Sequence, residues 1–277
     1  MFRIALTVVF VALLAALGGC NTGDLPTLGS SSSSPSSSSS GGNASAAGIW
    51  TGVDSASGMA MTAFIDSSGN ADFILANGVQ YTGTVQVAGT NVAISVEGYP
   101  QFGSQFSDTS TYGVGTFNGT VSTGSSLTGT LSFTTSDNTM STSDWSLTFS
   151  SLYDTASPLS AVSGTYTESS SAVSSGLDPL AGATVTISSS GALSGHSPTT
   201  GCALNGTLTN SNPSNDLFTV SYTYESCAGS YAGLNGVQFT GLADNDPNSS
   251  PAQVVIGATA QSSSGSFYAV VLALNHS

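Results

Sequence analysis

Hydrophobic and polar residues alternate with a period of two along most of the chain after residue 47. The segments 92–96, 145–149 and 218–224 each place aliphatic or aromatic side chains at every second position, with Ser, Thr or other residues between them. This period turns one face of a strand toward a core. No window keeps a helical spacing, and the strong helix formers Glu, Lys and Arg are nearly absent. The pattern predicts an all-β fold.

The alternating segments predict about eight strands in each half of the folded region. Asn77-Gly78 lies between two of them and is typical of a tight hairpin, because both residues tolerate positive φ. The second half repeats the arrangement, with a weaker third strand around Ala192. In the first half we expect strands near 48–54, 60–66, 70–76, 79–87, 91–98, 114–122, 127–134 and 144–151.

An internal repeat relates the two halves at an almost constant offset of 122 or 123 residues. A further short unit, an apolar residue followed by Thr or Asn, Gly and Thr, recurs in both halves, as in 117–120 and 204–207. Glycine within a strand permits the strong coiling that a small barrel needs. The matched pairs are Ile65–Gly69 with Ile187–Gly191, Gly83-Thr84 with Gly206-Thr207, and Phe117–Gly119 with Phe239–Gly241.

Eight antiparallel strands in about 110 residues suit a lipocalin-like up-and-down barrel, which has no free edges. We therefore expect two tandem modules, 48–157 and 158–277, and favour barrels over a fused sandwich. Closure matters here because the strands carry no lysine to discourage edge-to-edge aggregation.

The N-terminus has the three parts of a secretory signal: Arg3, an apolar run from Ile4 to Leu17, and small residues before Cys20. A helix of that run would be about 21 Å long, too short for a hydrocarbon core of about 30 Å. Leu17-Gly18-Gly19-Cys20 resembles the lipobox of bacterial lipoproteins. The resemblance implies cleavage after residue 19, acylation of Cys20 and, with Asn21 rather than Asp next, placement in the outer membrane. An ordinary cleaved signal is the alternative.

Residues 20–47 are rich in Ser and Gly and predict a disordered tether. Loss of the signal removes Arg3, the only Lys or Arg, so the mature chain carries a net charge of about −15. This charge excludes nucleic acid as a partner and excludes electrostatic adhesion to anionic lipid. We expect contact with the membrane through the N-terminal lipid alone. The layout of anchor, tether and small barrels resembles surface lipoproteins of the transferrin-binding and factor-H-binding type, in architecture only.

Cys202 and Cys227 flank a predicted hairpin and are expected to form a disulfide in an oxidising compartment. Two buried thiols are the alternative. We expect no metal and no cofactor: 244–255 resembles a calcium loop but lacks the glycine and the glutamate that an EF-hand requires at positions six and twelve.

We expect no catalytic residues. The chain has no Gly-x-Ser-x-Gly elbow, and its two histidines, His196 and His276, are expected in a loop and in the C-terminal tail.

Aromatic residues in the long connection 99–113 and in its counterpart of the second half are the candidates for recognition. They either bind a protein or glycan partner or fold inward and plug the barrels. The leading hypothesis is a non-enzymatic envelope lipoprotein with a binding or structural role; the alternatives are a hydrolase acting on polysaccharide or peptide, and a carrier of a small apolar ligand. The candidate binding loop comprises Tyr99, Phe102, Phe106, Tyr112 and Tyr231.

Overall fold

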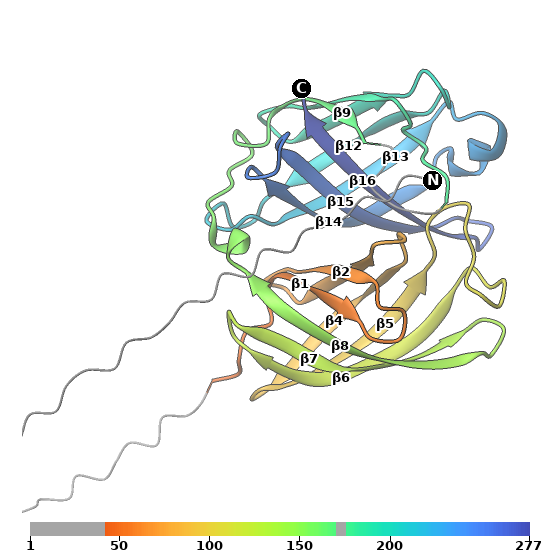
Figure 1. Cartoon of the computed structure of the whole chain (residues 1–277). Helices are drawn as coiled ribbons and strands as arrows, with labels where there is room; N and C mark the ends of the chain where they lie inside the picture. Colours follow the sequence, from red (N-terminus) through yellow and green to blue (C-terminus); the bar gives the residue numbers. More distant parts are fainter. Residues whose placement is uncertain (1–41, 170–175) are drawn as a thin grey trace, which may run out of the picture. The chain divides into compact units, whose positions relative to one another are not determined.

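The computed structural model describes residues 42–169 and 176–277, which form two closed antiparallel β-barrels of eight strands each (Figure 1). The predicted all-β fold with two tandem barrel modules is confirmed. Both barrels belong to one compact unit, Gly41–Ser277. Within the described ranges, no helix is long and apolar enough to cross a membrane.

The first barrel runs up and down through its eight strands, and β1 closes it by pairing with β8. A 3₁₀ helix, η1 (Ser151–Asp154), follows the last strand. The strands are β1 (Gly48–Asp54), β2 (Ala60–Ile65), β3 (Asn70–Leu75), β4 (Gln80–Ala88), β5 (Asn91–Tyr99), β6 (Gly113–Ser122), β7 (Ser126–Thr135) and β8 (Met140–Ser150).

The second barrel has the same order and closes by pairing β9 with β16. A second 3₁₀ helix, η2 (Gly229–Leu234), lies between its fifth and sixth strands. The strands are β9 (Gly164–Glu168), β10 (Thr184–Ile187), β11 (Ala192–His196), β12 (Ala203–Thr209), β13 (Phe218–Glu225), β14 (Gln238–Asp246), β15 (Gln253–Gln261) and β16 (Phe267–His276).

The expected strands of the first half lie within one residue of the observed bounds, except at the start of β8. This strand begins at Met140 rather than at 144, because the β7–β8 ladder continues to a turn in which the Thr135 N–H donates to the Thr139 carbonyl at 3.0 Å. Residues 140–144 are polar or exposed, so no apolar alternation marks their pairing.

The internal repeat appears in the structure as two turns with the same backbone conformation and the same hydrogen bond. Gly69 and Gly191 have φ angles of 88° and 83°, a conformation that favours glycine. Each glycine carbonyl accepts a backbone hydrogen bond from the fourth strand of its barrel: from Val85 at 2.8 Å in the first and from Leu208 at 2.7 Å in the second. The conserved offset in sequence therefore reflects equivalent positions in the two barrels.

Each barrel encloses its own core of inward-facing side chains. In the first, Phe73, Phe117 and Trp145 are fully buried, and the rings of Phe117 and Trp145 stack at 5.2 Å. In the second, Tyr222 stacks on Phe239 at the same centroid separation of 5.2 Å. These side chains fill the barrel interiors.

The strand glycines bring neighbouring backbones close together. Gly119 and Gly129 lie directly opposite each other on β6 and β7. A Cβ on Gly119 would clash with the carbonyl oxygen of Thr128 and would lie 2.8 Å from the Cα of Gly129. Only glycine fits this approach, which agrees with the role expected for the recurrent motif.

Residues 43–47, expected to be part of the tether, instead pack on the first barrel. The Ala44 N–H donates to the Gly89 carbonyl at 2.7 Å, and the Ala46 carbonyl accepts from the indole of Trp50 at 3.0 Å. Ala46 is buried against the core. These contacts outweigh the low hydrophobicity of the segment, so the contacts of the first barrel begin before Gly48.

Candidate functional site

The outer faces of the two barrels meet along an apolar seam. Ile49, Phe64 and Ile74 from the first barrel form a buried cluster with residues of the second, including Leu242 and Val271. These side chains occupy outward positions of their strands, since their neighbours in sequence point into the barrel cores. The seam therefore buries faces that an isolated barrel would expose to water.

A cleft of about 1100 Å³ lies beside the seam and is lined by strands of both barrels. Its walls are mainly hydroxyl and amide side chains. Thr84 and Ser95 are paired across β4 and β5 on one wall, and Thr240 and Thr259 are paired across β14 and β15 on the other. Cross-strand threonine and serine pairs form regular rows of donors and acceptors on a sheet surface.

Asp72 lies in the lining of the cleft and is 2% exposed. Neither of its carboxylate oxygens has a hydrogen-bond partner. The second barrel covers it, because a Cβ on Gly257 would clash with its Oδ2 atom. Burial away from water raises the pKa of Asp72 to about 8, so its carboxyl group is protonated at neutral pH.

Glu97 stands at one end of the cleft with two residues of the predicted binding loop. Tyr99 donates to its Oε2 at 2.6 Å and Tyr112 donates to its Oε1 at 3.2 Å. The ring of Tyr112 stacks on Phe267 of the second barrel at 3.9 Å. Burial, together with the hydrogen bond to Glu97, raises the pKa of Tyr99, so the phenol remains a donor.

The other three aromatic residues of the predicted loop divide between the barrels. Phe102 crosses to the second barrel, where its ring lies 6.1 Å from Tyr231 and 5.6 Å from Tyr268. Phe106 stays on the first barrel, 5.4 Å from Phe133. The loop thus connects the barrels. This arrangement differs from both predicted alternatives, an exposed loop that binds a partner and aromatic rings that plug the barrels. A binding role for the five residues stays a prediction.

The connection between the barrels is reinforced by backbone pairing. Gln101 forms a parallel bridge with Ala269 of β16, and the Phe102 N–H donates to the Ala269 carbonyl at 2.8 Å. The Gln101 side chain accepts from the Val271 N–H at 3.3 Å. The loop therefore fixes one end of the cleft.

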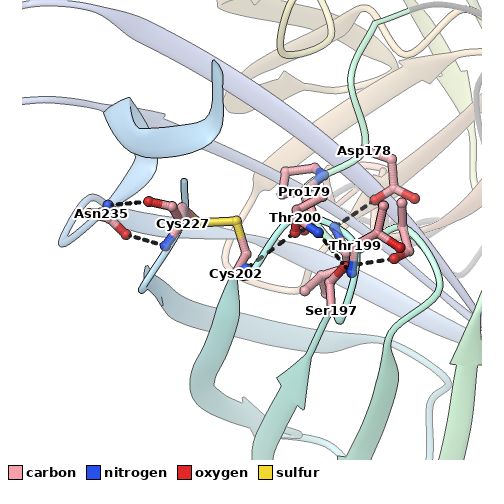
Figure 2. The surroundings of a disulfide bond; sticks show 10 residues. Asp178, Pro179, Ser197, Thr199, Thr200, Cys202, Cys227 and Asn235 are labelled. Atoms are coloured by element: carbon pink, nitrogen blue, oxygen red, sulfur yellow. Dashed lines mark hydrogen bonds between the residues drawn. A yellow bond between two sulfur atoms is a disulfide. The ribbon is translucent and has the colours of Figure 1, made fainter. Parts of the chain in front are cut away.

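The predicted disulfide between Cys202 and Cys227 is confirmed and joins the ends of β12 and β13 (Figure 2). Asn235 bonds both to the N–H and to the carbonyl of Cys227, at 2.8 and 3.0 Å. Thr200 accepts from the Cys202 N–H and donates to the Pro179 carbonyl. This network holds the segment around Asp178 over the mouth of the second barrel.

Glu168 and Asp178 lie together at that mouth. Glu168 is 6% exposed, and burial together with the charge of Asp178 raises its pKa to about 9. Burial also raises the pKa of Asp178. The alternation of β9 does not distinguish Glu168 from an ordinary polar residue at the end of a strand, so the sequence pattern does not mark it as part of a site.

The segment that resembles a calcium loop forms a hairpin end. Asp246 accepts from the N–H groups of Asn248 and Ser249 at 3.0 and 3.2 Å, as in an ordinary turn. Asp244 is buried on the outer face of β14, and burial raises its pKa to about 8. In the part of the chain that the structure covers, no three His, Cys, Asp or Glu side chains gather as a metal cluster.

The two histidines lie apart from the cleft lining, with His196 at the end of β11 and His276 at the end of β16. The predicted lipidation site, Cys20, lies outside the described residues, as do the signal and most of the tether. No protein-family model matches the sequence, and the search of curated proteins finds no match.

Proposed function

We propose that the chain is a non-catalytic, lipid-anchored lipoprotein of a bacterial envelope, whose paired barrels bind a neutral carbohydrate chain in the cleft between them. The supporting observation is the composition of that cleft, in which rows of hydroxyl and amide groups from two barrels face one space. The lipobox supports the anchor, and the acyl chains would hold the barrels at the membrane.

The charge of the chain narrows the class of ligand. The cleft lining contains only two ionisable carboxyl groups, Asp72 and Glu97, and no Lys or Arg. Anionic polymers would meet no cation there, and a strongly apolar ligand would leave the hydroxyl and amide groups of the lining without partners. Sugar hydroxyls can both donate to and accept from Thr, Ser, Asn and Gln side chains. A neutral glycan therefore fits the lining better than either rival ligand.

The carrier alternative is less well supported, because the side chains of the two cores fill the barrel interiors. The hydrolase alternative has one specific observation in its favour. Asp72 and Glu97 both pair with Thr82, from opposite sides, so they share the outer face of β3–β4–β5. A protonated acid and a second carboxylate in one cleft are the groups that glycoside hydrolysis requires. However, Asp72 is only 2% exposed and lies against Gly257 of the second barrel, so little of its carboxyl group is open to a bound chain.

Isothermal titration of the full chain with neutral hexasaccharides of glucose and of N-acetylglucosamine tests the proposal. We expect saturable binding to one of them, weakened at least about tenfold when Thr84→Val and Thr240→Val together remove a hydroxyl from each wall, since a buried polar contact is worth about 1–3 kcal/mol. Thr148→Val is the matched control, because Thr148 is exposed on β8 and does not line the cleft. Equal affinity in all three proteins, or no binding to either sugar, contradicts the proposal. Mass spectrometry of the incubated sugars would detect shortened products if the hydrolase alternative holds.

A further inference from the structure

Four polar atoms without hydrogen-bond partners meet inside the mouth of the second barrel. They are one carboxylate oxygen each of Glu168 and Asp178 and the hydroxyl oxygens of Tyr222 and Tyr224. Both tyrosines are at least 99% buried. The two phenols interact with each other, but neither makes a hydrogen bond of ordinary geometry. Buried polar groups normally form hydrogen bonds, so four such atoms without partners at one end of a barrel need an explanation.

Three of the four side chains point into the second barrel, and Asp178 lies beside Glu168 at its mouth. Glu168 occupies an inward position of β9, and Tyr222 and Tyr224 occupy inward positions of β13. The charge of Glu168 acts on both phenols, and the charge of Asp178 acts on Tyr224 and on Glu168. The remaining carboxylate oxygens already have backbone partners: the Ala273 N–H donates to Glu168 at 3.4 Å, and the Leu180 N–H donates to Asp178 at 2.8 Å.

The surroundings favour a small ligand. Leu180, Cys202 and Leu234 are fully buried around the mouth, and the disulfide network fixes the backbone on which Asp178 stands (Figure 2). No Lys or Arg occurs in the described ranges, so no basic side chain of these types pairs with the two acidic groups.

We propose that Glu168 and Asp178, together with the hydroxyl groups of Tyr222 and Tyr224, bind a hard divalent cation of the calcium class inside the second barrel. The donors are all oxygen atoms, which such cations prefer, and calcium accepts irregular ligand sets that include carboxylates and water. The site contains two acidic side chains, with phenol oxygens beside them, and is separate from the cleft between the barrels. The ion would tie β9 and β13 to the segment that closes the mouth.

Terbium luminescence of the purified full chain tests this site, because a bound lanthanide is excited through nearby tyrosine rings. We expect saturable emission that calcium displaces with a midpoint of about 10⁻⁴ to 10⁻³ M, the range of extracellular calcium modules. Loss of even an outer-shell partner weakens metal sites by about 10- to 100-fold, so Glu168→Gln and Asp178→Asn should each weaken binding at least tenfold. Glu225→Gln is the matched control, since Glu225 is exposed at the end of β13.

Calcium should also raise the thermal unfolding midpoint of the wild-type chain and of the Glu225→Gln variant, but not of the Glu168→Gln variant. Absence of terbium emission from the wild-type chain overturns the proposal. An equal loss in Glu168→Gln and Glu225→Gln also overturns it, because that result indicates general attraction of cations to an acidic surface. If circular dichroism shows that Glu168→Gln does not fold, the Asp178→Asn variant replaces it, because Asp178 is only partly buried. An unchanged terbium affinity in Asp178→Asn then refutes the site.

Discussion

Replacing Asp72 with asparagine tests how the two barrels are held together. Asp72 lies on the outer face of β3, is covered by the second barrel at Gly257, and has no partner for either carboxylate oxygen. Asparagine keeps the shape of the side chain but removes its titration. The variant therefore isolates the free energy of ionising this one group.

The size of the effect follows from the pKa of Asp72. In the unfolded chain the carboxyl titrates near 3.8, whereas burial raises its pKa to about 8 in the folded protein. Between these values the folded state holds more protons than the unfolded state, so the free energy of unfolding falls as the pH rises. Each pH unit corresponds to about 1.4 kcal/mol, which gives a loss of about 4 kcal/mol between pH 4 and pH 7. The loss ends above the folded-state pKa.

Urea unfolding followed by tryptophan fluorescence measures this loss in the correct barrel, because Trp50 and Trp145, the only tryptophans, both lie in the first barrel core. We expect the stability of Asp72→Asn relative to the wild-type chain to increase by about 4 kcal/mol from pH 4 to pH 7. Asp137→Asn, at an exposed turn between β7 and β8, is the control. If the wild-type chain and Asp72→Asn lose stability in parallel over this range, the burial of Asp72 between the barrels is refuted.

Three further perturbations test the fold and the anchor. Reduction of the bond between Cys202 and Cys227, whose separation is 25 residues, should destabilise the second barrel by about 3.5 kcal/mol in the chain-entropy model, and a circular dichroism transition unmoved by reductant contradicts this. Gly119→Ala should lower the urea midpoint of the tryptophan transition through a clash costing about 1–3 kcal/mol, and an unchanged midpoint argues against the close approach of β6 and β7. Cys20→Ser should abolish the mass of the acyl groups in intact-mass spectra of membrane-extracted protein, whereas a wild-type chain without added mass refutes the lipid anchor.

The sequence was informative wherever one face of a strand enters a barrel core. Period-two alternation and the repeat predicted the two barrels, most strand bounds of the first barrel, and the facing positions of Cys202 and Cys227. The predicted start of β8 was wrong because the first residues of this strand pair through the backbone without burying a side chain. Alternation identifies the face that enters a core but carries no information about backbone pairing at a polar strand end.

The cleft could not be predicted because it depends on which outer faces meet. Asp72 occupies a polar position of its strand and would be exposed on an isolated barrel, yet the second barrel buries it. Similarly, the aromatic side chains of the 99–113 connection indicated a candidate binding loop. They did not indicate that Tyr112 stacks on Phe267 of the other barrel. Contacts between surfaces that are distant in sequence leave no local pattern.

Mapping of backbone amide chemical shifts during titration with the bound hexasaccharide tests the central claim most directly. We expect the shifted amides to fall on β4 and β5 of the first barrel together with β14 and β15 of the second, around Thr84, Ser95, Thr240 and Thr259. Shifts confined to one barrel, or to the barrel interiors, would contradict a binding site formed between the two outer faces.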